Sequence, residues 1–350
     1  MKWNSWDRSP PYFYLARVMK YRRIGKSDFN ASVVALGAWA IGGWKWGGTE
    51  ESSAVRTIQS AIDHGINLID TAPIYGFGRS EEILGRAIKD RRDRVILATK
   101  CGLVWDRIAG DFHFYCDDKG QTENPSKYTV YRYLHPDSIS EEVERSLKRL
   151  NMECIDLYQT HFPDSTTRIE DTLAMLMKLK DQGKIRAFGA SNVTVEQLRQ
   201  YNASIVSDQE RFSMLDRNIE ENTNLAYCIE NDIALLAYSP LVHGLLTGKI
   251  GPEREFADGD LREGHPRFTV ENRLRILEML KQFEEIAKNH NANVSQLVIA
   301  WTFSQHGITH VLCGARTEDQ VIDNAKAGEI SLTTEEIEIM NKIIAASGNM

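Results

Sequence analysis

From Val33 onward, short apolar runs alternate with longer amphipathic stretches, and this alternation constrains the fold more than any other feature. Eight runs are rich in Val, Ile and Leu, as buried parallel strands are: 33–36, 67–70, 94–99, 155–159, 187–189, 205–208, 234–237 and 309–313. Eight stretches have helical periodicity: 51–64, 80–89, 136–150, 168–182, 194–201, 220–230, 272–290 and 318–327. The pattern predicts an α/β fold, a (β/α)8 TIM barrel. A doubly wound sheet is the alternative, because counting strands does not distinguish a closed sheet from an open one.

Several segments lie outside this repeat. Residues 1–18 are rich in Trp, Tyr, Phe and Pro, and we expect a poorly ordered extension before a single barrel domain at 19–350. Residues 21–29 read as a β-hairpin with its turn at Gly25 or at Lys26-Ser27. An extra helix is predicted over 294–305, before the last strand.

Two connections, 101–135 and 238–269, are too long to be plain turns. Loops longer than about 12–15 residues in a compact domain are usually functional or disordered. Both connections follow strands, so both are expected at the C-terminal face, where barrel enzymes place their active sites. The first contains Trp105, Arg107 and an aromatic cluster, which we interpret as walls of a substrate pocket. The alternative is a packed flap without ligand contact.

Composition excludes several classes of function. The net charge of −7 disfavours a nucleic-acid binder, which needs a basic excess. Five scattered cysteines without CxxC spacing predict neither a disulfide scaffold nor a zinc ribbon, and they suggest the cytoplasm. No run of 18 apolar residues predicts a membrane span, and no motif predicts a metal site or an obligate protein partner. No GxGxxG follows the first strand, so a Rossmann site is not expected.

Local signals also mark helix starts. Thr49, Asp137 with Ser138, and Thr317 each stand just before acidic residues. Their side-chain oxygens can accept hydrogen bonds from unpaired backbone N–H groups, and the acidic residues suit the positive end of the helix dipole. We therefore expect these residues to cap the helices that follow.

Four polar residues stand at or just after the ends of the second, third and fourth predicted strands. Asp70, Tyr75, Lys100 and His161 form this set, which we call the strand-end tetrad. Taken singly, each residue has a structural explanation. Asp70 could cap a helix, and Tyr75 could pack at the rim of the barrel. Lys100 could pair with a surface carboxylate, and His161 could be a hydrogen-bonded core histidine. A barrel would instead bring all four to one mouth.

The chemistry of the tetrad is coherent. A lysine that ends an apolar strand is costly to bury without a charge partner, and Asp70 can supply one. The lysine cation would stabilise the phenolate of Tyr75, which could then protonate a carbonyl oxygen. His161 could orient that carbonyl by a hydrogen bond. This set predicts hydride transfer to a carbonyl and therefore requires a hydride donor.

Motifs in a fixed order resemble those of the aldo-keto reductases. They are Asp70-Thr-Ala-Pro-Ile-Tyr75-Gly, Thr99-Lys100, His161-Phe-Pro-Asp, Gly-Lys-Ile-Arg-Ala-Phe-Gly-Ala-Ser-Asn at 183–192, Tyr-Ser-Pro-Leu at 238–241, Gly-Leu-Leu-Thr-Gly-Lys at 244–249, and Gly-Ala-Arg at 314–316 with Gln320 and Asn324. The resemblance runs from about residue 19 to the C-terminus. Within the family it is greatest to bacterial members near inositol and sugar metabolism.

The resemblance implies an NADP(H)-dependent reductase in which Tyr75 is the general acid. Lys100 and Asp70 would tune it, and His161 would orient the carbonyl. The implied cofactor-binding residues are Ala38, Trp39, Ser191, Asn192, Gln209, Tyr238, Ser239, Leu241, Gly244, Gly314, Arg316, Gln320 and Asn324. Trp39, Trp105 and Arg107 are the candidate substrate residues. Many reductases carry Lys or Ser for the 2′-phosphate where this chain has Gly314-Ala315, so Arg316 is the main cation expected there.

We therefore expect NADPH-dependent reduction of a small sugar- or polyol-derived aldehyde or ketone, for example a 6-oxo-sugar. One alternative is a regulatory, redox-sensing protein that resembles potassium-channel β subunits. Another is a Schiff-base aldolase with Lys100 as its nucleophile, which leaves Tyr238 and the 314–316 motif unexplained. The sequence names neither the substrate nor the direction of the reaction, because pocket specificity resides in the loops.

Overall fold

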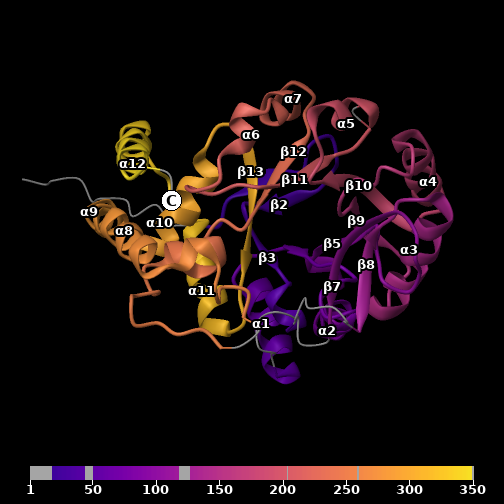
Figure 1. Cartoon of the computed structure of the whole chain (residues 1–350), viewed down its shortest axis with the longest axis horizontal. Helices are drawn as coiled ribbons and strands as arrows, with labels where there is room; N and C mark the ends of the chain where they lie inside the picture. The colour runs from indigo at the N-terminus through magenta and orange to yellow at the C-terminus, as the bar shows by residue number, and fades with distance from the viewer. Residues whose placement is uncertain (1–17, 44–49, 118–126, 203, 258–259, 349–350) are drawn as a thin grey trace, which may run out of the picture.

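Eight parallel strands close into a barrel at the centre of the molecule (Figure 1). The computed structural model describes residues 18–348 apart from 44–49, 118–126, 203 and 258–259. In barrel order the strands are β3 (Val34–Gly37), β4 (Leu68–Asp70), β5 (Ile96–Cys101), β9 (Ile155–Thr160), β10 (Ile185–Ser191), β11 (Ser207–Arg211), β12 (Ala234–Tyr238) and β13 (Ile308–Gly314). β13 pairs with β3, from Val311 opposite Val34 to Gly314 opposite Gly37. The closed barrel is confirmed, and the open sheet is excluded.

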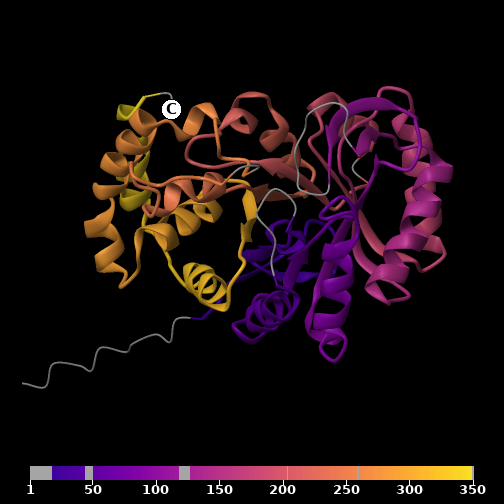
Figure 2. The same cartoon turned by 60° about the horizontal axis from the view of Figure 1, so that its bottom comes forward.

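Helices surround the barrel. They are α1 (Glu51–Asp63), α2 (Arg79–Ile88), α3 (Pro136–Leu150), α4 (Ile169–Asp181), α5 (Val195–Gln200), α6 (Asn218–Glu221), α7 (Asn224–Glu230), α8 (Val270–Lys281), α9 (Glu284–Asn289), α10 (Val294–Ser304), α11 (Glu318–Ala327) and α12 (Thr334–Ala346). Figures 1 and 2 show α3 and α4 on one side of the barrel and α8, α9 and α12 on the opposite side. The helix predicted over 294–305 is confirmed as α10.

Two predicted helices are each divided. The stretch 220–230 forms α6 and α7, because Thr223 adopts a left-handed conformation with φ of 67° between them. The stretch 272–290 forms α8 and α9, which are separated at Gln282 and Phe283. The sequence reading also missed α12, although Thr333 and Glu336 form a capping box at its start.

The predicted helix caps had mixed outcomes. Thr317 caps α11 by accepting a hydrogen bond from the backbone N–H of Gln320, as expected. The prediction for α3 is wrong, because His135 is its cap and Pro136 its first residue, so Asp137 and Ser138 lie inside the helix. Proline suits this first position because the N–H it lacks would have no helical partner. The cap of α1 is Glu50, and Thr49 lies outside the described residues.

The predicted N-terminal hairpin is confirmed and closes the lower end of the barrel. Strand β1 (Tyr21–Arg23) pairs antiparallel with β2 (Asn30–Ser32). At the turn, Gly25 has φ of 48°, and a Cβ there would lie 2.3 Å from the carbonyl oxygen of Val206. Ile24, Phe29 and Ala31 of this hairpin pack with inward-facing residues of the strands. The extension predicted at 1–18 lies outside the described residues, except for Val18.

The connection 101–135 contains a small sheet that the sequence reading did not anticipate. Strands β6 (Leu103–Val104), β8 (Tyr128–Arg132) and β7 (Asp111–Cys116) pair antiparallel in that order. This flap sheet joins an apolar cluster whose members include Trp39, Tyr75, Phe77, Trp105, Phe114, Tyr128 and Phe162. The described part of this connection is therefore a packed structure that covers one side of the strand-end tetrad.

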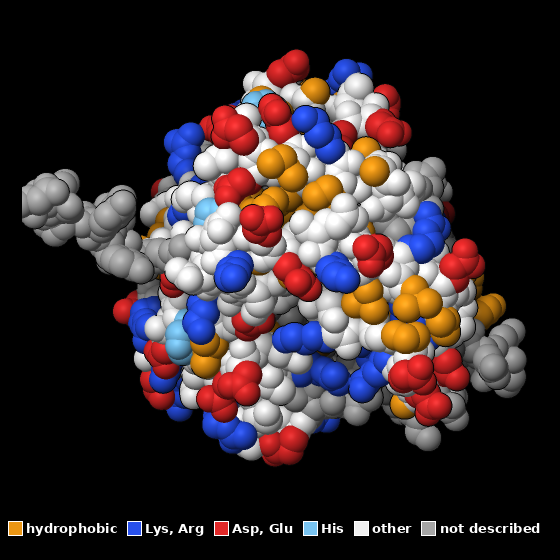
Figure 3. All heavy atoms as spheres, turned by 90° about the vertical axis from the view of Figure 1, so that its left-hand side faces the viewer, with side chains coloured by type: hydrophobic (Ala, Val, Ile, Leu, Met, Phe, Trp, Pro, Cys, Tyr) orange, Lys and Arg blue, Asp and Glu red, His pale blue; other side chains and the backbone are white. Residues whose placement is uncertain are grey.

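The surface carries both signs of charge. Figure 3 shows Lys and Arg side chains interspersed with Asp and Glu side chains across the face formed around α8, α9 and α12. Among the described residues, no helix has the length and apolarity needed to cross a membrane, and no group of three His, Cys, Asp or Glu side chains forms a metal site.

Candidate active site

Lys100 and Asp70 form a fully buried ion pair at the mouth of the barrel. Lys100, on β5, donates to Asp70 Oδ2 at 2.6 Å and to the carbonyl oxygen of Thr71 at 3.0 Å. Its Nζ lies 3.4 Å from the hydroxyl oxygen of Tyr75. A buried ammonium group is tolerated only with an opposite charge and complete hydrogen bonding. Both conditions hold here, and the cation is directed at the tyrosine hydroxyl.

The second carboxylate oxygen of Asp70 is held by two amide side chains. Asp70 Oδ1 accepts hydrogen bonds from Gln209 Nε2 at 2.8 Å and from Gln159 Nε2 at 3.2 Å. The sequence reading missed Gln159. It stands two residues before His161, and the two-residue period of a strand places both side chains on the inner face. That spacing was the available signal.

Tyr75 and His161 face each other across the mouth. Their rings are perpendicular, with centroids 5.8 Å apart, and His161 also stacks on Phe162. Burial, reinforced by the charge of Asp70, raises the pKa of Tyr75 well above its usual range. Burial and the cation of Lys100 lower the pKa of His161 well below its usual range. The tyrosine is therefore a phenol and the histidine a neutral imidazole at neutral pH.

The charge state of Lys100 results from two opposing effects. Burial lowers its pKa, whereas the charge of Asp70 and the hydrogen bond to that residue raise it. The short contact between the two groups argues for an ammonium–carboxylate pair. A cation is thus in place next to Tyr75 before any ligand arrives.

A cluster of polar side chains lies beside the tetrad. Asn192 follows β10 and has a left-handed backbone, with φ of 58°. Its Nδ2 donates to the carbonyl oxygen of His161 at 2.9 Å and to Ser191 Oγ at 3.0 Å. Its Oδ1 accepts from the hydroxyl of Tyr238 at 2.8 Å. Ser191 in turn donates to the carbonyl oxygen of Gln209 at 2.7 Å. Four of the predicted cofactor residues therefore form one connected group.

The loop after β12 has a strained backbone. Ser239, Val242 and His243 have positive φ angles of 59°, 46° and 53°, and Gly244 follows at 92°. Such conformations persist only when the surroundings impose them, and they concentrate at functional sites. Leu241 lies within this segment, just before η3 (Val242–Thr247).

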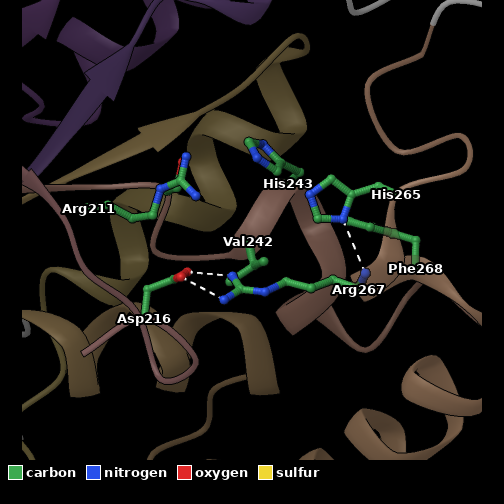
Figure 4. Close-up of a pocket in the computed structure, with 8 residues that line it drawn as sticks. Arg211, Asp216, Val242, His243, His265, Arg267 and Phe268 are labelled. Carbon is green, nitrogen blue, oxygen red and sulfur yellow. Dashed lines mark hydrogen bonds and ion pairs between the residues drawn. The ribbon is translucent and has the colours of Figure 1, made fainter. Parts of the chain in front are cut away.

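A small pocket lies behind this loop (Figure 4). It is lined by Arg211, Asp216, Ser239, Val242, His243, His265, Arg267 and Phe268. Asp216 pairs with Arg267 at 2.8 Å, and burial lowers the pKa of His243 to about 4. The guanidinium of Arg211 lies 5.8 Å from the ring centre of Tyr238. These residues support the loop and Tyr238 from behind.

The residues predicted near the last strand gather at the far end of the site. Asn324 of α11 donates to the carbonyl oxygen of Gly314 at 3.3 Å. The backbone N–H of Arg316 donates to Gln320 Oε1 at 2.8 Å. Both contacts shape the turn that leads into the N-terminus of α11, where backbone N–H groups favour anions.

Of the remaining predicted residues, three lie near the tetrad or in its apolar cluster and one does not. Ala38 is buried, with its N–H bonded to the carbonyl oxygen of Asp70, and the ring of Trp39 lies 6.2 Å from that of Tyr75. Trp105 packs edge-on against Phe77 in the flap cluster. Arg107 is not brought to the tetrad.

The guanidinium of Arg107 pairs instead with Glu141 of α3 at 2.6 Å and with Asp106 at 3.1 Å. Glu141 is 34 positions away in the chain, so this partner was not readable from local sequence. Trp39 and Trp105 therefore remain the predicted substrate residues that lie in the apolar cluster of the site.

Comparison with known proteins agrees with this geometry. The aldo/keto reductase family model matches residues 33–345, and the chain belongs to this family. It is 39% identical to the aldo-keto reductase YhdN of Bacillus subtilis, over 93% of this chain and 94% of that protein. It is 38% identical to the NADH-specific methylglyoxal reductase of Escherichia coli, over 94% and 99%.

A solved structure is also similar. The glycerol dehydrogenase of Gluconobacter oxydans superposes with a TM-score of 0.83 at 38% identity, covering 95% of this chain and 97% of that one. The protein is therefore an oxidoreductase that reduces carbonyl groups, as the sequence predicted. Its family uses a nicotinamide dinucleotide as hydride donor.

Proposed function

We propose that the protein reduces a small sugar- or polyol-derived aldehyde or ketone to the alcohol with NADPH, and that Tyr75 is the general acid. The observation that carries this proposal is the buried pair of Lys100 and Asp70 with its cation 3.4 Å from the hydroxyl of Tyr75. This arrangement suits a site in which negative charge develops on oxygen.

Each member of the tetrad has a distinct task in this mechanism. Tyr75 holds its proton at neutral pH because burial raises its pKa, and it delivers that proton to the carbonyl oxygen as charge develops there. Lys100 stabilises the phenolate that remains, and Asp70 holds the ammonium in place. His161 is a neutral imidazole that can donate one hydrogen bond to the same oxygen. The bound cofactor supplies the hydride.

The donor set suits the chemically different parts of the cofactor. Ser191, Asn192 and Gln209 offer the amide and hydroxyl groups that a carboxamide needs, and Tyr238 offers an aromatic face to the nicotinamide ring. Contacts with the pyrophosphate are assigned to Ser239, Leu241 and Gly244. Contacts with the adenosine 2′-phosphate and adenine are assigned to Gly314, Arg316, Gln320 and Asn324, next to a helix N-terminus. Ala38 and Trp39 complete the set at the first strand.

The preference for NADPH over NADH is part of the proposal. Arg316 is the cation that supports it, because a phosphate needs a positive partner and α11 begins at the next turn. One relative is named as NADH-specific and another, from fission yeast, as using NADP(+), so the family accommodates both. Steady-state kinetics with each cofactor at equal concentrations decide between them.

A neutral, hydroxylated carbonyl compound is the proposed substrate class. The rings of Trp39 and Trp105 offer flat apolar faces of the kind that pack against sugar C–H groups, and Arg107 is engaged elsewhere. The names of two relatives, a methylglyoxal reductase and a glycerol dehydrogenase, also refer to small oxygen-rich compounds. The predicted cytoplasmic location, the absence of a nucleic-acid or membrane partner and the lack of an obligate protein partner stay predictions.

The test is a panel of carbonyl compounds with purified protein and NADPH, followed at the nicotinamide absorbance band. We expect oxidation of NADPH with short aldoses, ketoses or hydroxyaldehydes and weaker rates with long apolar aldehydes. Tight cofactor binding without turnover on any carbonyl would instead favour the redox-sensing alternative. Borohydride trapping of a substrate on Lys100 would favour the aldolase.

A further inference from the structure

Two acidic side chains are buried behind the site, in a place that the proposed mechanism does not use. Asp208 and Glu210 lie on β11, and the strand period directs both to the face opposite Gln209. Figure 1 shows α5 and α7 over this part of the barrel. Asp208 is fully buried and Glu210 is 9% exposed. The two carboxyl groups interact with each other, and Asp208 Oδ1 has no N–H or O–H donor among the described residues.

The acidic pair is bonded to the turn that follows β10. Glu210 Oε1 accepts a hydrogen bond from the backbone N–H of Val193 at 2.9 Å. The backbone N–H of Asn192 donates to the carbonyl oxygen of Gln209 at 3.2 Å. On the other side of Val193, Asn224 Nδ2 of α7 donates to the carbonyl oxygen of Val193 at 2.6 Å. These contacts fix the peptide groups on both sides of Val193.

This turn carries Asn192, which has the left-handed φ of 58°. Asn adopts this conformation more readily than most other non-glycine residues, and the contacts around Val193 hold the turn in place. The Asn192 side chain links the carbonyl oxygen of His161 to the hydroxyl of Tyr238. The acidic pair therefore acts, through this turn, on residues at the ends of β9 and β12.

We propose that Asp208 and Glu210 are positioning residues, which share one proton and hold the Asn192–Val193 turn in the shape that binds the nicotinamide end of the cofactor. This inference rests on the proposed function, which assigns Asn192 to the carboxamide. Neither acidic side chain touches the reacting atoms, and both act through Asn192.

The shared proton follows from the geometry. Two carboxylates in contact repel each other when both are ionised, so one proton is retained between them. With the proton on Asp208, its hydroxyl can donate to Glu210, whose negative charge then faces the backbone N–H of Val193. Burial raises the pKa of Glu210 to about 7 and that of Asp208 well above its usual range.

The groups that face the acidic pair from neighbouring elements add no charge at neutral pH. Cys228 of α7 has its Sγ 3.9 Å from Asp208 Oδ2, and burial raises its pKa. Tyr201 after α5 and Tyr238 on β12 also have a pKa raised by burial. The hydroxyl of Tyr238 bonds to Asn192. The titration of the pair therefore involves its own two protons: the first leaves near pH 7, and the second leaves at alkaline pH.

Three variants of the full-length protein test this role by fluorescence titration with NADPH between pH 6 and pH 10. Glu210→Ala removes the acceptor of the turn, and we expect the Kd for NADPH to rise at least tenfold. Asp208→Asn keeps a donor to Glu210 and cannot lose it, so its Kd should stay within threefold of wild type at pH 7. Wild type should bind NADPH more weakly at alkaline pH, and Asp208→Asn should lack that weakening.

Cys228→Ala is the matched control, because Cys228 contacts Asp208 without touching the turn. It should lower the Tm and leave the Kd unchanged, which separates loss of packing from loss of positioning. Amide hydrogen exchange of residues 190–194 without cofactor gives a readout that does not depend on NADPH. Exchange there should rise in Glu210→Ala and stay unchanged in Cys228→Ala.

Each outcome decides the inference. The inference would be overturned if Glu210→Ala kept the wild-type Kd for NADPH and the wild-type amide hydrogen exchange. It would also be overturned if Asp208→Asn still bound NADPH more weakly at alkaline pH. Where Glu210→Ala does not fold, Glu210→Gln replaces it, because its amide can donate to ionised Asp208 and accept from Val193. That variant should bind within threefold of wild type but move the pH dependence. Failure of the proposed function is separate: wild type itself would not bind NADPH, whereas the exchange measurement would still report on the turn.

Discussion

The two ends of the proposed cofactor site are built differently. At the tetrad end, Lys100 and Asp70 are buried, and each polar atom of this pair is hydrogen-bonded to a neighbour from another strand. At the end formed by residues 314–324, Arg316 is half-buried just before a helix, where its backbone N–H donates to Gln320 and its carbonyl oxygen accepts from Thr57 Oγ1. One end is interlocked with the barrel core, and the other is carried by a surface turn.

This difference separates chemistry from cofactor choice. Changes at the tetrad end alter charges that the low-dielectric interior cannot screen, so they affect turnover and folding together. In the proposed site, changes at the surface end alter a screened interaction with the 2′-phosphate, so we expect them to affect binding alone. The presence of an NADH-specific protein among the relatives fits an end that can vary without disturbing the tetrad.

The largest effect is expected from Tyr75→Phe. Removing the hydroxyl removes the proton donor and leaves the ring in the apolar cluster, so kcat should fall by about 10³-fold or more, near the upper range for general acid catalysis. The Kd for NADPH should stay within about twofold, because Tyr75 is not a cofactor contact in this scheme. Stopped-flow hydride transfer and cofactor fluorescence measure the two quantities. If Tyr75→Phe turned over at the wild-type rate, the assignment of the chemistry to the tetrad end would be wrong.

Lys100→Met should show that the tetrad end is also structural. It leaves Asp70 as an unpaired buried charge, and breaking a buried pair in this way costs about 3–5 kcal/mol. Urea unfolding at pH 7 measures the loss. The double variant Asp70→Asn with Lys100→Met removes both charges and should recover most of the stability without recovering activity. A single variant as stable as wild type would contradict the argument.

We expect acid to lower the free energy of unfolding through two buried histidines, His161 in the tetrad and His310 outside it. His310 lies on β13, is fully buried, and has a pKa lowered by burial to about 4. The unfolded chain titrates near 6.5, so it binds more protons than the folded chain between pH 6.5 and 4, and stability falls as pH falls through that window. At pH 5 this difference amounts to about 2 kcal/mol for one histidine.

The matched variants are His310→Gln and His161→Gln. Both should flatten the dependence of the free energy of unfolding on pH below 6.5, because the pKa of His161 is lowered in the same direction. Only His161→Gln should lose turnover, since His310 lies away from the tetrad and contacts Thr309 and Arg22. Equal losses of activity in both variants would show that the two regions are coupled.

The smallest effect is expected at the surface end. Arg316→Ala should raise KM for NADPH about tenfold, as the loss of one charge-assisted phosphate contact does, and leave kcat unchanged. KM for NADH should change by less than twofold, and the effect on NADPH should shrink at high salt. Equal changes with both cofactors would assign Arg316 to the adenine ring rather than to the 2′-phosphate.

The sequence predicted the barrel because its strands are buried on both faces and read as continuous apolar runs. It predicted the tetrad because parallel strands place their carboxyl ends together, so Asp70, Lys100 and His161 had to meet if the barrel closed. The hairpin was readable from its turn signals, since Gly25 and Lys26-Ser27 follow directly after Tyr21–Ile24.

What the sequence did not reveal depends on contacts between distant residues. The flap sheet pairs Leu103 with Arg132, and its aromatic composition was equally compatible with a loop. Arg107 finds its partner on α3, where it forms an ion pair on the outer surface. The break at Thr223 needs a left-handed residue that has no glycine to mark it. By contrast, α12 was missed although its capping box was present.

The pairing of β3 with β13 has a consequence for synthesis of the chain. The first strand of the barrel bonds to the last, with Val34 opposite Val311, so nearly the whole chain must leave the ribosome before the sheet can close. Until then, β3 presents an unpaired backbone edge that can pair with other chains. Contacts between such distant positions also slow folding. Premature release of the nascent chain therefore yields a sheet with two open edges, a natural substrate for chaperones.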